Sequence, residues 1–209
     1  MAHLLLIDTC GDGGGVGIAI GDTLVAERPL PGRETQERLM AAIAEILHEA
    51  ALTIQQLSAI AVVTGPGSFT GVRIGLAAAK GLAEATGLPL IALSRLAILA
   101  AQVSGSETQA WLDAGRTDIY VRRNGEELML PAAAALEGAH NGQVVLMEDR
   151  LATLLPSATR VAPVGVRQAL PLALDHLRQQ TFADTALLNA NYLRVPDAEL
   201  ALQARLAAQ

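Results

Sequence analysis

The sequence predicts a mixed α/β protein made of two related halves, of which the second is smaller. Three observations support this prediction. Both halves begin with an apolar run that ends in an acidic residue, at Asp8 and at Asp113. In the first half, three strand patterns precede the first helical pattern, and strands and helices then alternate. A polar stretch around residue 105 separates the predicted halves, residues 1–105 and 106–209.

Composition narrows the possible functions. The chain has 209 residues, of which 51% are hydrophobic and only 2% are aromatic, so we expect a core of aliphatic side chains. A net charge of −6 gives no basic surface for a phosphate backbone, and few rings are available to stack on bases. Cys10 is the single cysteine, and no apolar run reaches the ~18 residues of a membrane span. We therefore expect a soluble, cytoplasmic protein without a targeting segment or membrane association.

A meander and a helix open the first half. An apolar run over residues 4–7 predicts a buried strand with Asp8 at its carboxyl end. Two further strand patterns flank the pair Gly21-Asp22, which favours a tight hairpin turn. Apolar residues then recur every three to four positions over 35–51, which is the period of an amphipathic helix.

The rest of the first half alternates strands with helices. Thr53 and Gln56 have the spacing of a capping box, in which both side chains satisfy backbone donors of a short helical turn. Gly87 ends a longer helix, and Ser94 is placed to cap the next one. The predicted elements are a strand over 60–63, a helix over 71–86, a strand over 90–93 and a helix over 95–103.

The second half shows shorter patterns. Its first two strands form a pair that turns at Ala114-Gly115-Arg116. The predicted elements are strands over 108–113, 119–123 and 144–147, and helices over 149–155 and 167–179.

This order of elements suggests the actin, Hsp70 and sugar-kinase type of fold (ASKHA, RNase H-like). Six segments also resemble the bacterial TsaB (YeaZ) family of the tRNA threonylcarbamoyladenosine pathway. The segment over 61–75 is the most specific, because a chance match to so many ordered positions is improbable. The matching segments are Leu6–Thr9, Gln36–Leu39, Ala61–Gly75, Ala79–Leu82, Asp113–Arg116 and Tyr192–Asp197.

The glycine-rich loop before the helix over 71–86 is a candidate nucleotide or phosphate site. Backbone donors at a helix N-terminus can bind an anion. The loop lacks the Gly-Lys-Ser/Thr ending of a Walker A motif. The alternative, which we prefer, is that its glycines only allow close packing against the sheet. The candidate residues are Asp8, Gly65, Gly67, Ser68, Thr70 and Gly71.

An enzyme is the alternative class of function. In an ATP-dependent phosphotransferase of this fold, Asp8 and Asp113 would hold Mg²⁺ through water from opposite sides of a cleft. The small second half leaves little chain for an adenosine pocket, and each aspartate can simply cap its own turn. The four histidines lack the His-x-x-x-His spacing of a metal site, and no base can be assigned to Cys10, Ser68 or Ser94. We therefore predict no catalytic residue, no metal and no cofactor.

The two long helices of the first half carry more apolar surface than one sheet can cover. At about 100° per residue, the apolar residues of the first helix fill an arc of about 160°, whereas packing on one sheet needs about 100°. Small residues on the second helix would let another helix approach closely. The alternative is that C-terminal helices of the same chain cover this face. The predicted partner-binding residues are Leu39, Met40, Ile43, Ala44, Leu47, Ile74, Ala78, Gly81 and Ala85.

The family resemblance implies an accessory subunit. It implies that these helices dock on the matching pair of TsaD, which transfers threonylcarbamoyl to N6 of adenosine 37 in tRNAs reading codons that begin with A. It further implies the ATPase TsaE in a larger complex, indirect contact with tRNA, and a homodimer through the same helices. An old family label, glycoprotein endopeptidase, is a third possibility. Family members often carry His and Ser where this chain has Thr35 and Gln36, and Ser where it has Cys10, which makes nucleotide chemistry on this chain less plausible.

Overall fold

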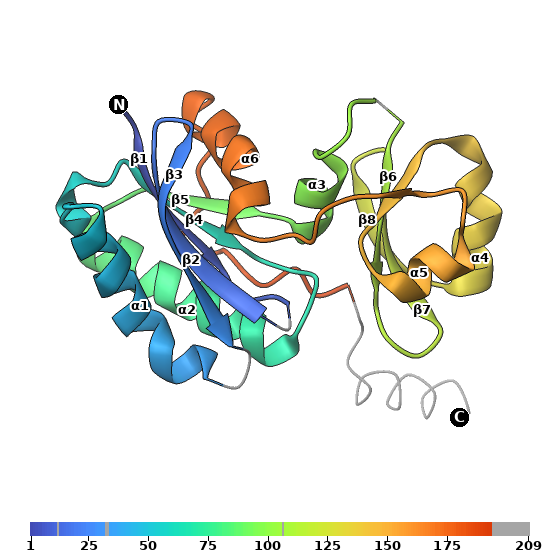
Figure 1. The fold of residues 1–209 in the computed structure, drawn as a ribbon, viewed down its shortest axis with the longest axis horizontal. Coiled ribbons are helices and arrows are strands. Elements are labelled where there is room, and N and C mark those ends of the chain that lie inside the picture. The colour runs from blue at the N-terminus through green and yellow to red at the C-terminus, as the bar shows by residue number, and fades with distance from the viewer. Residues whose placement is uncertain (12, 32–33, 106, 194–209) are drawn as a thin grey trace.

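Two five-stranded sheets form the framework of the protein (Figure 1). The computed structural model describes residues 1–11, 13–31, 34–105 and 107–193. The first sheet has the order β3-β2-β1-β4-β5 and consists of His3–Asp8 (β1), Gly13–Ile20 (β2), Thr23–Pro31 (β3), Ala59–Val63 (β4) and Leu90–Leu93 (β5). The second has the order β10-β9-β6-β7-β8 and consists of Gln109–Asp113 (β6), Asp118–Arg123 (β7), Glu126–Pro131 (β8), Val144–Leu146 (β9) and Thr159–Arg160 (β10).

The two sheets share one topology, which confirms the prediction of two related halves. In each, the first strand pairs antiparallel with the next strand along the chain, β1 with β2 and β6 with β7. On its other side it pairs parallel with a strand that follows a helical crossover, β1 with β4 and β6 with β9. The helical elements are Thr35–Glu49 (α1), Ile54–Gln56 (η1), Phe69–Thr86 (α2), Arg95–Ala100 (α3), Ala132–Glu137 (α4), Gly138–Asn141 (η2), Asp149–Leu154 (α5) and Val166–Arg178 (α6).

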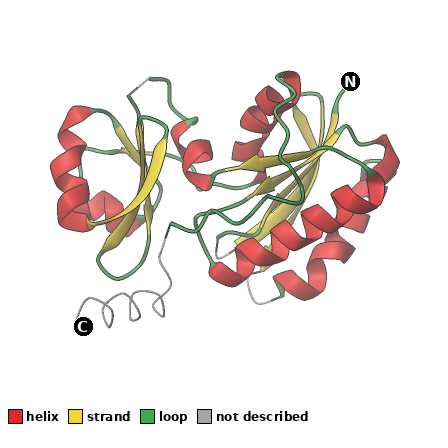
Figure 2. Ribbon diagram, turned by 180° about the vertical axis from the view of Figure 1, so that it is seen from behind, coloured by secondary structure: helices red, strands yellow, loops and turns green. Residues whose placement is uncertain are grey.

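The first sheet is covered on both faces. Helices α1 and α2 lie on one face and α6 lies on the other (Figures 1 and 2). Successive residues of β1 point to opposite faces, so Leu5 and Ile7 pack with α1 and α2, whereas Leu4 and Leu6 pack with α6. The continuous apolar run of β1 is therefore explained by burial on both sides.

The second sheet has its own core around Trp111, which is fully buried and packs with residues of α4 and α5. Helix α3 lies between the sheets and contacts β6, β7 and α6. Helix α6 and the segment that follows it return from the second half of the sequence to the first sheet. The predicted division at residue 105 falls between α3 and β6. The chain passes from the first sheet to the second there, and it returns to the first sheet at α6.

Most predicted elements are confirmed, and four were missed. The meander, α1, α2, β5 and the cap of Ser94 agree with expectation, and the Oγ of Ser94 accepts from the amides of Leu96 and Ala97. Helix α3 ends at Ala100, earlier than predicted. The missed elements are β8, α4, η2 and β10. In the described part of the chain, no helix combines the length and the hydropathy needed to cross a membrane.

Candidate functional site

The carboxyl end of β1 is sealed inside the protein. Asp8 is 3% exposed, and one of its carboxylate oxygens accepts from the backbone N–H of Cys10 at 2.9 Å. Burial raises the pKa of Asp8, although that hydrogen bond and the charge of Arg95 oppose the shift. The Sγ of Cys10 faces the carbonyl oxygen of Val63 at 3.2 Å, and burial raises the pKa of this thiol well above its usual value. Asp8 therefore caps its own turn, and Cys10 is held in the unreactive thiol form.

The glycine-rich loop packs directly on that turn. A Cβ on Gly67 would lie 2.3 Å from the carbonyl oxygen of Cys10, and a Cβ on Gly71 would lie 2.0 Å from that of Thr9. The N–H of Ser68 donates to the oxygen of Cys10 at 2.9 Å, and its side chain accepts from Gly71. The amide of Ser68 donates to the turn after β1, and Gly67 and Gly71 permit close contact with it, so the structure favours the packing interpretation.

The remaining members of the predicted anion site do not form a cradle. Gly65 has φ +103, which glycine adopts without strain, and it precedes a cis proline. Its carbonyl oxygen accepts from the N–H of Arg95 at 2.7 Å. Thr70 lies on the exposed surface of the first turn of α2, whereas Asp8 is buried. These groups do not converge on one accessible point.

A charged junction joins the two sheets. Arg95, the first residue of α3, lies close enough to Asp8 and Glu148 to lower the pKa of both carboxyls, while burial raises both. On the second sheet, Arg150 binds both carboxylate oxygens of Asp113, at 2.5 and 2.6 Å. These hydrogen bonds lower the pKa of Asp113. The carboxylate at the end of the second acid-tipped strand is thus bound by a guanidinium of the same chain.

The nucleotide and metal implied by the fold do not fit these residues. One of the two expected acids is buried and the other is bound bidentately by Arg150. Among the described residues, no group of three or more His, Cys, Asp and Glu side chains is arranged to hold a metal ion. The Nε of Arg95 and one oxygen of Glu148 are buried without a hydrogen-bond partner, and the charge of Arg95 lowers the pKa of Glu148.

The predicted docking residues divide into core and surface groups. Leu39 and Ile43 are buried among the core side chains beneath α1, which corrects their assignment as contact residues: the stripe of α1 that faces the sheet had been counted with the free face. Three others are half-buried and pack against that core, namely Leu47, Ile74 and Ala78. The exposed members are Met40, Ala44, Gly81 and Ala85.

The C-terminal helix α6 does not cover this exposed group. It contacts β1, β2, β4 and β5 from the opposite face of the first sheet, as Figures 1 and 2 show. The segment after α6 crosses α2 on its other side, where the Nζ of Lys80 donates to the carbonyl oxygen of Leu188 at 3.0 Å. The segment after α6 therefore contacts the side of α2 that was expected to be polar and solvated at Lys80, whereas Glu84 on the same side remains exposed.

An aromatic cluster at the N-terminal end of α2 was missed. The guanidinium of Arg73 lies 3.5 Å from the ring centroid of Phe69, and its Nε donates to the hydroxyl of Tyr192 at 2.6 Å. Phe69 is 57% exposed and Tyr192 is 47% exposed, although so few aromatic residues argued against exposed rings. The i, i+4 spacing of Phe69 and Arg73 could have indicated the stack, whereas Tyr192 gave no local signal.

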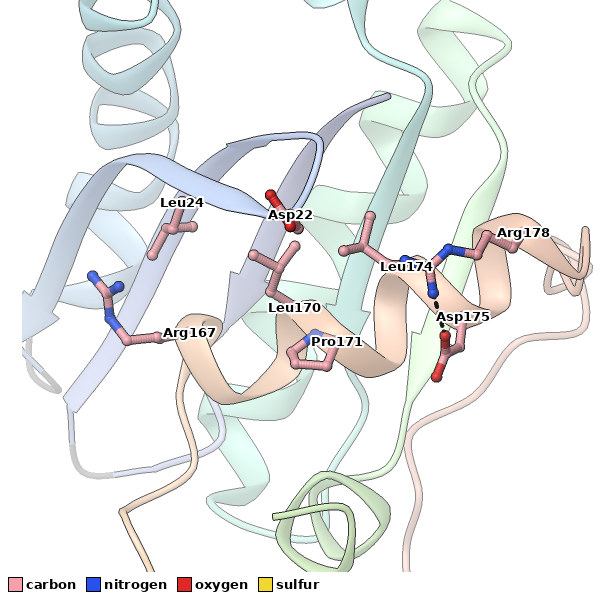
Figure 3. Close-up of a pocket in the computed structure, with 8 residues that line it drawn as sticks. All are labelled: Asp22, Leu24, Arg167, Leu170, Pro171, Leu174, Asp175 and Arg178. Atoms are coloured by element: carbon pink, nitrogen blue, oxygen red, sulfur yellow. Dashed lines mark hydrogen bonds and ion pairs between the residues drawn. The ribbon is translucent and has the colours of Figure 1, made fainter. Parts of the chain in front are cut away.

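A groove of about 330 Å³ lies beside α6, on the face of the sheet away from α1 and α2. Figure 3 shows an apolar floor that includes Leu170 and Leu174, with charged side chains at the rim. Both rim arginines are already paired, Arg178 with Asp175 at 2.6 Å and Arg167 with the carboxylate of Glu27 at 3.0 Å. The rim therefore offers no free cation that would select a ligand.

Three comparisons with known proteins identify relatives of this chain. Residues 30–151 match the family model described as TsaD: tRNA N6-adenosine threonylcarbamoyltransferase. The tRNA threonylcarbamoyladenosine biosynthesis protein TsaB of Escherichia coli is 37% identical over 98 residues, which are 47% of this chain and 42% of that protein. This chain therefore matches less than half the length of that relative.

Two further relatives match along nearly the whole chain. An uncharacterized protein of Mycobacterium tuberculosis is 32% identical over 95% of each sequence. The crystal structure of a Pseudomonas aeruginosa protein with similarity to peptidase YEAZ has a TM-score of 0.75 at 25% identity, covering 93% of this chain and 100% of that one. This likeness confirms the predicted α/β fold class.

Proposed function

Because the chain belongs to the TsaB (YeaZ) family, we propose that it is a noncatalytic subunit that binds and activates a TsaD-type tRNA threonylcarbamoyltransferase. The names of the E. coli relative and of the matching family model support involvement in tRNA threonylcarbamoyladenosine biosynthesis. The adenosine 37 transfer and its metal chemistry would belong to the partner.

The observation that supports this proposal is the face of α1 and α2 that the described residues leave exposed. Met40, 51% exposed, stands among exposed small residues on both helices. A Cβ on Gly81 would meet no atom within 4 Å, so the backbone of α2 is open to close approach there. Small side chains let two helices pack with little between them. Such a face suits a partner that presents its own helix pair.

Substitution of this face tests the proposal. Gly81→Arg and Ala44→Arg put a long charged side chain at exposed positions, so we expect both variants to fold and to lose association with the transferase. Ala133→Arg on α4 is the matched control, because Ala133 is also an exposed helical alanine and lies on the second sheet. The measurement is co-purification of tagged chain with the TsaD-type protein of the same organism, with circular dichroism as the check on folding.

Activation needs a separate measurement. We expect the transferase alone to modify tRNA slowly, the chain alone to have no activity, and the mixture to be fast. The Gly81→Arg variant should fail to accelerate the reaction, whereas Ala133→Arg should behave like the unsubstituted chain. Undiminished binding and activation by the arginine variants would remove the helix-face proposal.

The other members of the assembly follow from the same proposal. The isolated chain would form a homodimer through α1 and α2, which the transferase displaces, so Gly81→Arg should convert dimer to monomer in light scattering. TsaE would join the larger complex, and tRNA would contact this chain only indirectly. The expected cytoplasmic location fits a tRNA substrate.

A further inference from the structure

Glu127 is a carboxylate shared by three segments of the chain. It lies on β8 of the second sheet, and its side chain is 11% exposed. One oxygen accepts from the hydroxyl of Ser94 at 2.5 Å and from the Nη1 of Arg122 at 2.8 Å. The other oxygen accepts from the Nδ2 of Asn191 at 2.5 Å. All three partners are donors, so a carboxylate is the group that satisfies them together.

These partners connect the two sheets. Arg122 lies directly opposite Glu127 in the β7–β8 pairing, so it holds the carboxylate within the second sheet. Ser94 follows β5 and caps α3, at the carboxyl edge of the first sheet. The hydrogen bond between Ser94 and Glu127 therefore crosses between the halves of the molecule.

Asn191 belongs to a segment that we call the strap, residues 181–193. The strap leaves α6 and pairs with the first sheet, where the N–H of Ala183 donates to the oxygen of Leu90 at 2.8 Å and the N–H of Asn191 donates to that of Thr64 at 2.8 Å. Between these points it receives the hydrogen bond of Lys80 from α2. In Figure 1 it runs from the end of α6 across the middle of the molecule.

The residue after Asn191 is Tyr192, which completes the cluster with Phe69 and Arg73 on α2. The strap otherwise has no helix or strand of its own over these residues. A segment that forms no helix and no strand of a sheet depends on individual side-chain and backbone contacts for its position. The carboxylate of Glu127 thus binds Asn191, the residue next to the ring that contacts α2.

We propose that Glu127 is an interlobe latch, which fixes the strap on the first sheet and thereby positions Tyr192 against α2. Glu127 is a positioning residue in this device: it holds Ser94 and Asn191 and leaves the surface beside α2 in one arrangement. The latch belongs to the isolated chain and does not depend on the proposed partner.

Hydrogen exchange of the strap tests the latch. Asn191→Asp removes the donor and sets a second carboxylate against Glu127, so we expect the amides of Ala183 and Asn191 to exchange at least tenfold faster. The double variant Glu127→Gln with Asn191→Asp restores a pair, because the new amide nitrogen can donate to the new carboxylate while its oxygen still accepts from Ser94 and Arg122. We expect exchange to return to within about threefold of the original rate, as coupled residues are not additive.

Glu126→Gln is the matched control, since Glu126 neighbours Glu127 on β8 but is exposed. Its strap amides should exchange as in the unsubstituted chain. Amides of β1 and β4 report global stability and should not change in any variant, so accelerated exchange confined to the strap supports the latch. Equal exchange in Asn191→Asp and the original chain, failure of the double variant to restore protection, or acceleration spread over β1 and β4 would each overturn it. None of these outcomes bears on transferase binding, which the Gly81→Arg test decides separately.

Discussion

The contact between the glycine-rich loop and β1 can be tested within one helix. Gly71 and Gly81 both lie in α2, and neither has a positive φ. An added Cβ at Gly71 would lie 2.0 Å from the backbone oxygen of Thr9, whereas one at Gly81 would meet nothing within 4 Å. Gly→Ala in an unstrained helix stabilises a protein by about 0.5–1 kcal/mol. The two substitutions should therefore change stability in opposite directions.

The magnitude at Gly71 follows from the distance. A Cβ and an oxygen need more than 3 Å, so the start of α2 would have to move about 1 Å from β1. Overpacking of this kind costs about 1–3 kcal/mol. The movement would also strain the hydrogen bond from the hydroxyl of Thr9 to the oxygen of Gly71, 2.6 Å long, which is worth about 1 kcal/mol. After subtracting the helical gain, we expect Gly71→Ala to lose about 1–3 kcal/mol.

Thermal unfolding followed by circular dichroism measures both variants. At roughly 2–4 °C per kcal/mol for a chain of this size, Gly71→Ala should melt several degrees lower, and Gly81→Ala should melt a few degrees higher. Adding inorganic phosphate should leave the melting temperature of the unsubstituted chain unchanged, because the amide of Ser68 donates to Cys10 and the loop packs on the turn after β1. Equal shifts for the two variants, or strong stabilisation by phosphate, would refute the packing interpretation.

Two further predictions concern the acid-tipped strands. Asp8→Asn keeps an oxygen for the N–H of Cys10 and removes a buried charge, so it should raise stability at neutral pH by about 1 kcal/mol. Burial raises the pKa of Asp8, so the stabilisation that protonated Asp8 gives the folded state is present below the unfolded pKa and is lost as pH rises through the folded pKa. The stability gained by Asp8→Asn should therefore shrink in acid. An unchanged gain at low pH would contradict this. Arg150→Ala should cost about 1 kcal/mol at neutral pH, reduced by the partial exposure of the pair. Arg150 lowers the pKa of Asp113, so the stability lost in Arg150→Ala should disappear as pH falls through the folded pKa of Asp113, as measured by urea unfolding at a series of pH values. If the loss persists in acid, it comes instead from the hydrogen bonds that Arg150 donates to backbone carbonyls.

Local signals accounted for the elements whose stability is local. Helix α1 and the cap at Ser94 could be predicted from the sequence, because helices and caps depend on neighbours within four residues. Strand β8 was missed because it begins with two glutamates and lacks β-branched residues. Its place in the sheet depends on β7, where Arg122 faces Glu127. Such cross-strand pairing leaves no mark within the strand itself.

The site was harder to predict, because its decisive contacts join distant residues. Arg73 and Tyr192 are 119 positions apart, and Glu127 and Asn191 are 64 apart. Side chains that meet only after folding leave no periodicity or spacing to detect. Residue type also misled, since Leu39 is as apolar as a docking residue but lies in the core.

The small residues of α2 differ in their surroundings along the helix. At Gly71 and Gly75 the missing side chain lets the helix sit on Thr9, and a Cβ there would collide at 2.0 and 2.3 Å. Gly81 and Ala85, by contrast, are exposed. In this arrangement Asp8 is buried, and the N–H of Ser68 donates to the carbonyl oxygen of Cys10 rather than into an accessible anion site. If the outer face of α2 binds the proposed partner, this close packing on β1 would lower the cost of ordering the helix on binding.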